Sequence, residues 1–362
     1  MAGSARNLQR TRLSKSYTHE LDRGWMVLRT YCLKMLGVVL VLSEFSEDAI
    51  NELLVTFIQR AYEHSRSHYH LVKHAVLSVQ VRRPYFRGRL RRAWESLESW
   101  GLERTKRLRT ALPLPILLCY GIVARTLACE REGIQAHQWW SLSVLCEAAF
   151  YGFLRPIEFL NLRRCMVNLP GNLASIGEFA VVAIFEPKNR RFLGDKQFST
   201  IRSTQSTLWL EWLCKGLSPA HKLWPYSHQI FRDKLKTLSH MLGLGDWKVG
   251  PSSFRPGGCT HFFSSGVEVS RLLFYGRWLS EKSLKHYIQE SISQQLLLTL
   301  GETQSRTFNA ILEKGEHLLS PPAKNWWELS RRPDVAPGAQ SLLPQRRVQP
   351  SVEWRRLYPK PT

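Results

Sequence analysis

The sequence predicts a mainly α-helical (α+β) protein with one small β-sheet. Apolar residues recur at helical spacing over most of the chain, which favours amphipathic helices. Only "EFAVVAIFEP" (178–187), rich in β-branched residues, and "QFSTI" (197–201) beyond a basic turn are typical of strands. A length of 362 residues is enough for two domains and a tail.

The balance of charge is strongly basic. Lysine and arginine total 51 against 29 aspartate and glutamate, a formal charge of +22. An excess of that size predicts a polyanionic partner, with double-stranded DNA as the first candidate and an anionic membrane as the second. The longest apolar run, "MLGVVLVL" (35–42), is much shorter than the roughly 20 residues that a membrane span needs. We therefore expect no membrane-spanning segment.

The seven cysteines are odd in number and form no C-x-x-C pair. This pattern argues against a disulfide framework and against a zinc site, so we expect no metal. It also favours a reducing, intracellular compartment. The basic ends of the chain favour the nucleus if the host is eukaryotic.

Changes in composition divide the chain into four predicted segments. Residues 1–18 form a basic, disordered arm, and residues 19–110 form a helical DNA-binding domain. A mostly helical domain with the small sheet covers 111–320, and a Pro- and Arg-rich disordered tail covers 321–362. The proline-punctuated "ALPLPILL" (111–118) is expected to connect the two domains.

Three helices are predicted in the first domain. One begins after a capping Ser46 in "SEDAINELLVTFIQRAYEHS", and the others cover 70–81 and 91–100. The run "RRPYFRGRLRRAWESLESWGLERTKRLR" (82–109) then mixes arginines with aromatic residues, which suits contacts to a duplex backbone. The alternative is a solvated helix face. The candidate DNA-binding residues are Arg82, Arg83, Arg87, Arg89, Arg91 and Arg92.

The second domain is expected to begin with helices and to return to helices after the two strands. The predicted helices cover about 139–151, a segment starting near 156, 205–215, 226–242, 257–276 and 281–291. Beyond them, "ISQQLLLTLGETQSRTFNAILEKGEHLL" (292–319) continues as an amphipathic helix.

Three stretches of this domain can carry chemistry. "AFYGFLRPIEFLNLR" places Arg155 three residues before Glu158, in an apolar setting where an unpaired guanidinium is costly. "SSFRPGGCTHFFSSG" places Arg255 just before Pro-Gly-Gly, and "LLFYGRWLSEKSLKHYIQES" holds Trp278 and Tyr287. Taken singly, each has a structural interpretation: a helix ion pair, a solvated arginine and a packing aromatic.

Together, the three stretches resemble the motifs of the tyrosine recombinase (phage integrase) family of DNA breaking–rejoining enzymes. "GFLRPIEFL" is similar to the family's Gly-Leu-Arg-x-x-Glu-Leu, with the glycine one position further back. "SSFRPGGCTHFF" is similar to His-x-Leu-Arg-His-x-x-x-Thr-His and keeps Arg255, Thr260 and His261. "GRWLSEKSLKHY" keeps the family's interval of nine residues from Trp278 to the tyrosine, with Gly276 one residue further from the tryptophan than usual.

The resemblance covers about 110–300, and it implies a helical core-binding domain followed by a catalytic domain. It implies site-specific recombination or integration of DNA through a 3′-phosphotyrosine intermediate, without ATP or a metal. The "RPGG" form is most similar to eukaryotic transposon-type members, which are mobile elements. The family's C-terminal helix docks on a neighbouring protomer, which implies a homo-oligomer on DNA; the alternative is that this helix packs on its own domain.

The resemblance also assigns roles. Two guanidiniums can clamp the nonbridging phosphate oxygens while a phenol attacks phosphorus in line. A lysine on a β-hairpin protonates the leaving 5′ oxygen, a role that falls to Lys188 with Lys196 as the reserve. An indole N–H can donate to the phosphate or pack the site closed. The implied catalytic residues are Arg155, Lys188, Arg255, Trp278 and Tyr287, with Glu158, Ser252 and His261 in support.

One position departs from the family pattern. Ser252 stands three residues before the second arginine, where the family usually has His or Lys. A serine hydroxyl can bind a phosphate but does not accept a proton near neutral pH. Two alternatives to a recombinase therefore stay open, a catalytically inactive DNA-binding remnant and a type IB topoisomerase-like enzyme. We expect His261 to be a core histidine.

Overall fold

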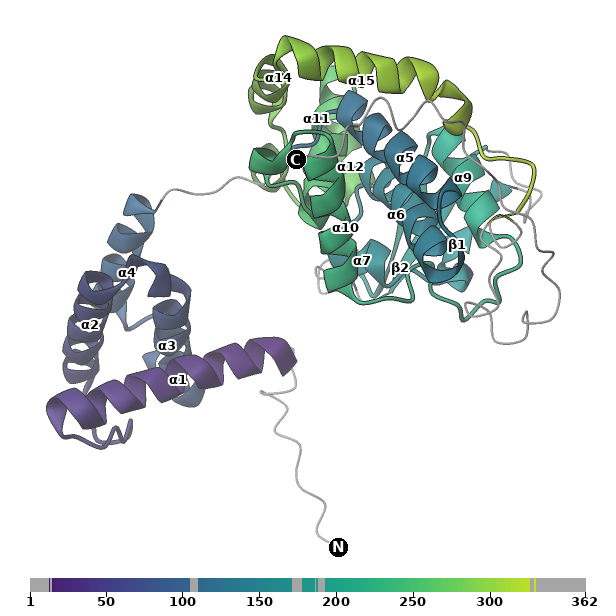
Figure 1. The fold of residues 1–362 in the computed structure, drawn as a ribbon. Coiled ribbons are helices and arrows are strands. Elements are labelled where there is room, and N and C mark those ends of the chain that lie inside the picture. Colours follow the sequence, from purple (N-terminus) through teal and green to yellow (C-terminus); the bar gives the residue numbers. More distant parts are fainter. Residues whose placement is uncertain are drawn as a thin grey trace, which may run out of the picture. The chain divides into compact units, whose positions relative to one another are not determined.

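A computed structural model describes residues 13, 15–104, 110–170, 178–185, 187, 193–325 and 329. Its contacts divide the chain into two compact units, Met1–Arg107 (unit 1) and Leu108–Thr362 (unit 2). Most described residues are helical and the sheet has three short antiparallel strands, so the predicted fold class is confirmed (Figure 1). Over these ranges, none of the helices combines the length and the apolar character that crossing a membrane requires.

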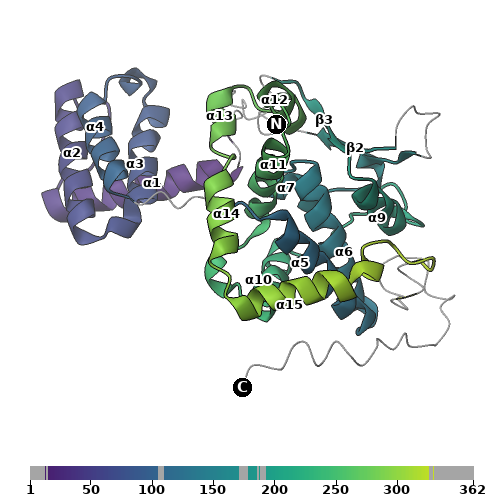
Figure 2. The same ribbon diagram turned by 90° about the horizontal axis from the view of Figure 1, so that it is seen from above.

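In unit 1, α1 packs along α3, and α2 packs against α4 (Figure 2). Its elements are α1 (Lys15–Leu36), α2 (Glu47–His64), η1 (Arg66–His68), α3 (Tyr69–Arg82), η2 (Pro84–Phe86) and α4 (Arg91–Glu103). Ser46 caps α2 as predicted, because its hydroxyl accepts a hydrogen bond from the Ala49 N–H at 3.2 Å. Helix α1 begins at Lys15, so the helical part starts before residue 19. Residues 1–12 and 14 of the predicted arm lie outside the described residues.

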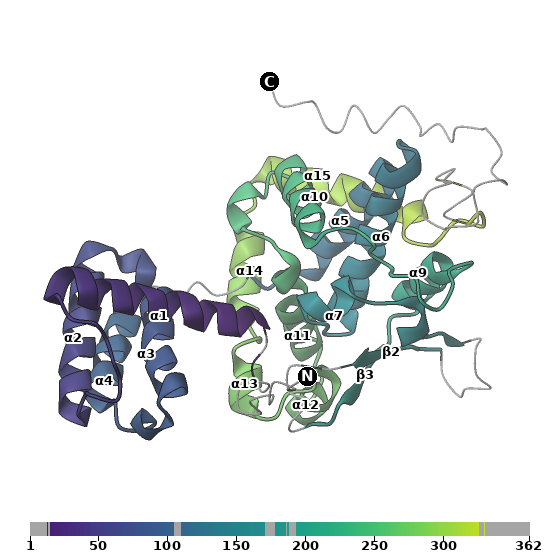
Figure 3. The same ribbon diagram turned by 90° about the horizontal axis from the view of Figure 1, so that it is seen from below.

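Unit 2 packs its helices around α5 and α6, with the sheet at one side and β3 beside α12 (Figure 3). The strands run in the order β1-β2-β3, with Val182 opposite both Val167 and Ser199. The elements are α5 (Leu114–Cys129), α6 (Gly133–Tyr151), α7 (Pro156–Leu160), η3 (Arg164–Met166), β1 (Val167–Asn168), β2 (Ala180–Phe185), β3 (Lys196–Ile201), α9 (Thr204–Cys214), α10 (His228–Met241), η5 (Gly245–Trp247), η6 (Pro251–Ser253), α11 (Phe254–Ser264), α12 (Val269–Gly276), α13 (Glu281–Lys285), α14 (Glu290–Leu298), α15 (Glu302–Lys314) and η7 (Glu316–Leu318).

The central helix α5 was not predicted, and the connector proposed for 111–118 is wrong over its second half. Helix α5 is apolar on all sides and buried almost throughout, so it has no amphipathic period to detect. Pro113 is its N-cap residue, and Pro115 lies in its first turn, where a missing N–H costs nothing. The prolines that suggested a connector therefore mark the start of a helix.

Two predicted helices are each divided in the structure. The segment 257–276 forms α11 and α12, and the chain turns between them at Gly266, whose φ of +82° is a left-handed conformation that favours glycine. The segment 281–291 forms α13 and α14, and Tyr287 lies in the turn between them. The amphipathic segment after 291 is likewise two helices, α14 and α15.

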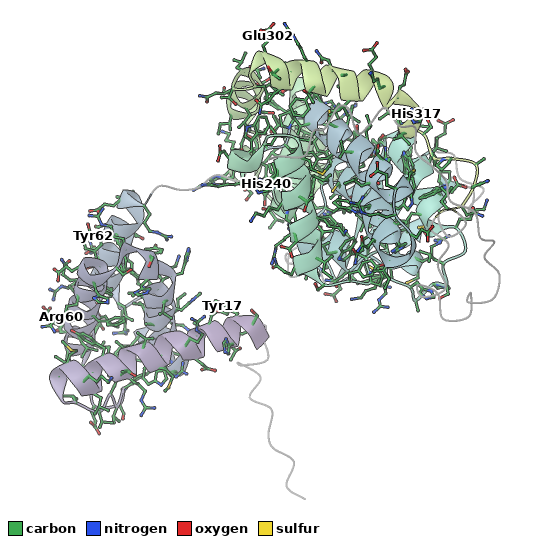
Figure 4. The ribbon with its side chains drawn as sticks, in the orientation of Figure 1. Tyr17, Arg60, Tyr62, His240, Glu302 and His317 are labelled. Atoms are coloured by element: carbon green, nitrogen blue, oxygen red, sulfur yellow. The ribbon has the colours of Figure 1, made fainter. Side chains whose placement is uncertain are left out.

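The C-terminal part of the described chain packs on the core of unit 2. Helix α15 begins at Glu302, and η7 contains His317 (both labelled in Figure 4). Phe308 and Ile311 of α15 are buried in the core around α5, so this helix packs on its own unit.

Residues beyond η7 continue this attachment. Trp209 Nε1 donates to the Leu319 carbonyl at 2.6 Å, and Trp212 Nε1 donates to the Lys324 carbonyl at 2.8 Å. The first residues of the predicted disordered tail, 321–325, are therefore held against α9. Apart from residue 329, the rest of that tail lies outside the described residues.

The two glycines of "RPGG" let α11 approach the centre of unit 2. A Cβ added at Gly258 would lie 2.0 Å from the Phe150 carbonyl oxygen at the end of α6. A Cβ at Gly257 would lie 2.4 Å from the Leu112 carbonyl oxygen. Both obstacles are backbone atoms, so any larger residue must move α11 and the arginine that it carries.

We predict that Gly258→Ala lowers the free energy of unfolding by roughly 1–3 kcal/mol or more, the usual cost of overpacking a core. Gly250→Ala is the matched control, because an added Cβ there meets nothing within 4 Å. It should change stability by no more than about 0.5 kcal/mol. Urea unfolding followed by tryptophan fluorescence measures both; equal stability of the two variants would contradict the close approach of α11 to α6.

Candidate active site

Arg255 is the centre of the candidate site. It lies in the first turn of α11, with 2% of the residue exposed. Its Nη2 donates to the Gly276 carbonyl at 2.6 Å, and its Nη1 donates to the Phe153 carbonyl. One guanidinium therefore joins three segments that are far apart in the sequence: the end of α6, the start of α11 and the end of α12.

Trp278 and Tyr287 lie against the same guanidinium. The Arg255 Cζ is 4.4 Å from the centroid of the Trp278 ring and 5.2 Å from that of the Tyr287 ring. The two ring centroids are 5.1 Å apart. Cation–π contacts of this kind stabilise a guanidinium away from water. Three of the predicted residues thus meet in one cluster, in which Tyr287 is only partly buried.

Two buried donors in this cluster lack a partner. Within the described residues, Arg255 Nε and Trp278 Nε1 make no hydrogen bond, although both atoms are enclosed. Buried polar groups are normally paired, and each exception calls for an explanation. These two N–H groups therefore keep a hydrogen-bonding capacity that the described residues do not use.

Arg155 joins the cluster through Glu158. Its backbone N–H and its Nη1 donate to the Glu158 carboxylate, each at 2.8 Å. The ion pair that the sequence offered as the structural alternative for Arg155 is therefore present. The other face of the carboxylate receives Arg277, whose Nη2 donates to Oε2 at 2.9 Å and whose Nη1 donates to Oε1 at 3.4 Å.

Arg277 was not singled out from the sequence, although the displaced glycine of the third motif was a signal. Helix α12 ends in a Schellman motif, with Arg277 N donating to Phe274 O and Trp278 N to Leu273 O. Arg277 occupies the left-handed position of this motif, with φ +59°, where glycine is usual. The glycine is instead at 276, where an added Cβ would overlap the Trp278 ring.

The first motif repeats this arrangement at the end of α6. Phe153 N donates to Phe150 O and Leu154 N donates to Ala149 O, and Phe153 has φ +48°. The glycine again precedes the left-handed residue, at 152. In both motifs, a large side chain therefore occupies the position where the family pattern has glycine. In both motifs, this side chain points to the site. Phe153 packs against Trp278, with ring centroids 5.9 Å apart.

The cluster has an excess of positive charge. Burial, followed by the like charges of Arg155 and Arg277, lowers the pKa of Arg255 to about 9, which leaves it protonated at neutral pH. Burial raises the pKa of Glu158, but Arg277 and Arg155 together outweigh it, so the net pKa lies below its ordinary value. The cluster thus holds three guanidiniums and one carboxylate, an arrangement suited to an anionic ligand.

Thr260 fixes the turn that carries Tyr287. Its hydroxyl donates to the Tyr287 carbonyl at 3.2 Å and accepts from the Gln289 N–H at 3.0 Å. These are backbone groups that a continuous helix would use internally, so their capture by Thr260 explains why the predicted helix 281–291 is interrupted. Thr260 is 4% exposed, and it anchors the turn to α11.

Four other candidates are placed differently. His261 packs against Phe150 and Phe262, with ring centroids 5.8 and 5.4 Å apart, and burial lowers its pKa. Ser252 lies half-buried in η6, and its side chain makes no hydrogen bond within the described residues. Lys196 is exposed at the start of β3. Lys188 lies outside the described residues.

Most of the candidate DNA-binding arginines of unit 1 already have partners. Arg82 pairs with Asp22 at 2.6 Å and stacks on Trp25. Arg83 donates to the Leu42 carbonyl and stacks on Phe86. Three further ion pairs join Arg89 to Glu47 at 3.1 Å, Arg91 to Glu95 at 2.7 Å and Arg92 to Glu52 at 2.6 Å. Of the six, Arg87 alone has no such contact within the described residues.

Comparison with known proteins gives distant similarities. Neither a protein-family model nor a curated protein matches the chain. A crystal structure of XerA recombinase is similar over 84% of this chain and 94% of its own, at 13% identity and a TM-score of 0.36. Pre-cleavage and post-cleavage complexes of XerH site-specific recombinase with difH substrates are similar over 78% of this chain and 97% and 96% of theirs, at 13% and 14% identity and TM-scores of 0.39 and 0.40. Structural similarities with TM-scores this low do not indicate what this chain does.

We predict that Thr260→Val lowers the free energy of unfolding by roughly 1–3 kcal/mol, because it leaves the Gln289 N–H and the Tyr287 carbonyl unpaired while preserving shape. The Gln289 amide should also exchange its hydrogen faster. Thr260→Ser keeps the hydroxyl and should retain slow exchange at Gln289. Slow exchange of that amide in the valine variant would show that the turn is held by something else.

Proposed function

We propose that the chain breaks and rejoins double-stranded DNA through a covalent phosphotyrosine at Tyr287. The observation that carries the proposal is the contact of the Arg255 guanidinium with both Trp278 and Tyr287, 4.4 and 5.2 Å from the ring centroids. A nucleophile and a cation that are 32 positions apart in the sequence thus share one site. The motif resemblance adds the expectation that the substrate is a DNA phosphodiester.

In the proposed reaction, Arg155 and Arg255 donate to the nonbridging oxygens of a phosphodiester, where charge accumulates in the transition state. Tyr287 loses its phenolic proton to water, and its oxygen forms a bond to phosphorus as the bond from phosphorus to the 5′ oxygen breaks. A proton passes to the leaving 5′ oxygen, and Lys188 is the proposed donor. The 3′-phosphotyrosine keeps the energy of the phosphodiester, so a 5′ hydroxyl can reverse the step and rejoin the strand.

At the finer level, we propose site-specific recombination or integration, with unit 1 supplying contacts to the duplex. The basic run of unit 1 and its stacked aromatic side chains support this role. Recombination needs more than one protomer on DNA. Helix α14, which has no buried residue, leaves Leu298 84% exposed and is the proposed contact between copies.

We predict that the full chain forms a covalent adduct with a pool of end-labelled, nicked duplexes of random sequence, and that Tyr287→Phe abolishes it. Tyr275→Phe is the matched control, because this tyrosine lies in the same apolar cluster as Tyr287 but contacts Arg202 rather than Arg255. Denaturing gels measure the adduct, and peptide mass spectrometry locates it.

The outcomes separate the candidate functions. An adduct that persists in Tyr287→Phe would overturn the assignment of the nucleophile. Binding of the pool without any adduct would favour the inactive DNA-binding remnant. An adduct together with relaxation of a supercoiled plasmid, but no exchange between two sites, would favour the type IB topoisomerase-like enzyme.

We predict that Arg87→Gln weakens DNA binding and reduces the slope of log affinity against log salt by about 1, the effect of one lost phosphate contact. Arg82→Gln should leave the slope nearly unchanged, because the Arg82 side chain is 22% exposed and already pairs with Asp22. Fluorescence anisotropy with a labelled duplex over a range of salt concentrations measures both. Equal losses in the two variants would mean that Arg82 leaves Asp22 for the phosphate.

A further inference from the structure

Glu158 is shared between two arginines of very different accessibility. The side chain of Arg155 is 19% exposed, whereas those of Arg277 and Glu158 are each 5% exposed. Arg155 is therefore the member of the pair that an incoming anion can reach. Its guanidinium is already engaged by the Glu158 carboxylate at 2.8 Å.

To bind a phosphate, Arg155 must break its ion pair with Glu158. The free-energy cost of breaking this ion pair depends on Arg277. A buried carboxylate that loses its counter-ion is strongly destabilised. Arg277 donates to both oxygens of Glu158, so that carboxylate keeps a cationic partner when Arg155 leaves. Without Arg277, Glu158 would compete with the phosphate for the same guanidinium.

The backbone of Arg277 also indicates a need for its side chain. An arginine at φ +59° in a Schellman motif adopts a conformation that is strained for it and unstrained for glycine. The side chain makes a further contact, since Nη2 also donates to the Phe153 carbonyl that Arg255 binds, at 3.4 Å. Glycine at this position would relieve the backbone strain. Because arginine is present instead, its side chain is a candidate for a functional role.

We propose that Arg277 is a positioning residue that holds the charge of Glu158 and so releases Arg155 to bind the scissile phosphate. The inference rests on the proposed function for its substrate, a DNA phosphodiester, but it concerns a residue to which the family motifs assign no role. In this proposal, Arg277 acts through Glu158 and Arg155 and does not contact the phosphate. Removing the carboxylate should therefore make Arg277 dispensable.

The test uses Arg277→Gly, which removes the guanidinium while relieving the left-handed backbone, so folding should be preserved. Adduct formation with the nicked duplex pool should fall at least roughly tenfold. Lys248→Gly is the matched control: Lys248 is also positively charged with a left-handed backbone, φ +51°, and it is exposed at the C-cap of η5. It should form adduct at the rate of the unaltered chain.

The double variant Glu158→Gln/Arg277→Gly separates positioning from structure. It restores the net charge of the cluster and frees Arg155, so its adduct rate should return to within roughly threefold of Glu158→Gln alone. A purely structural role for Arg277 would not be rescued by removing a charge. No recovery, or an undiminished rate in Arg277→Gly, overturns the proposal.

A second measurement needs no cleavage. Inorganic phosphate, at an ionic strength held constant with chloride, should raise the melting temperature of the unaltered chain and of Lys248→Gly. The rise should be lost in Arg277→Gly and return in the double variant. If the unaltered chain forms no adduct but shows this pattern, the proposed function fails while the role of Arg277 stands; an equal rise in all four proteins overturns that role.

Discussion

The burial of one guanidinium is the constraint on which the site depends. Removing a charged group from water is costly unless its hydrogen bonds are replaced, and the replacements for Arg255 are two backbone carbonyls, from Phe153 and Gly276. Backbone carbonyls at the ends of helices can be presented in this way because they are not used internally. The ends of α6 and α12 must therefore meet at the start of α11.

That meeting is achieved by two helix endings of the same kind. Both α6 and α12 end in a Schellman motif with a large residue, Phe153 or Arg277, in the left-handed position. Each motif turns the chain sharply, so that the next residues, which include Arg155 and Trp278, face the same cluster as Arg255. Helix α6 supports these two helix endings rigidly. It is buried from Ala136 to Phe150, and the glycines of α11 lie against its end.

The two units use charge in different ways. In unit 2, three arginines and one carboxylate concentrate positive charge where few water molecules can screen it, which is where charge acts most strongly. In unit 1, residues 15–104 hold fourteen Lys and Arg against ten Asp and Glu, a small share of the total charge of +22. Many of those arginines lie in exposed ion pairs, which are weak and can be exchanged for contacts to a phosphate backbone.

The sequence by itself determined the elements whose signals are local. An amphipathic period and a capping serine predict α2, and β-branched residues predict β2 and β3, because those patterns report on a helix face or a strand without reference to the rest of the chain. It also selected Arg155, Arg255, Trp278 and Tyr287, through spacings within three short stretches. The catalytic roles of these residues remain predictions.

Only the tertiary structure decided the rest, because it depends on neighbours that are distant in the sequence. Helix α5 is surrounded on all sides, so its sequence has no polar face to reveal it. The break at Tyr287 follows from hydrogen bonds to Thr260, 27 positions earlier. The importance of Arg277 follows from its contact with Glu158, 119 positions away. From the sequence, the arginines of 82–92 are expected to form one basic surface. In the folded chain, Asp22, Glu47 and Glu52 lie beside three of them.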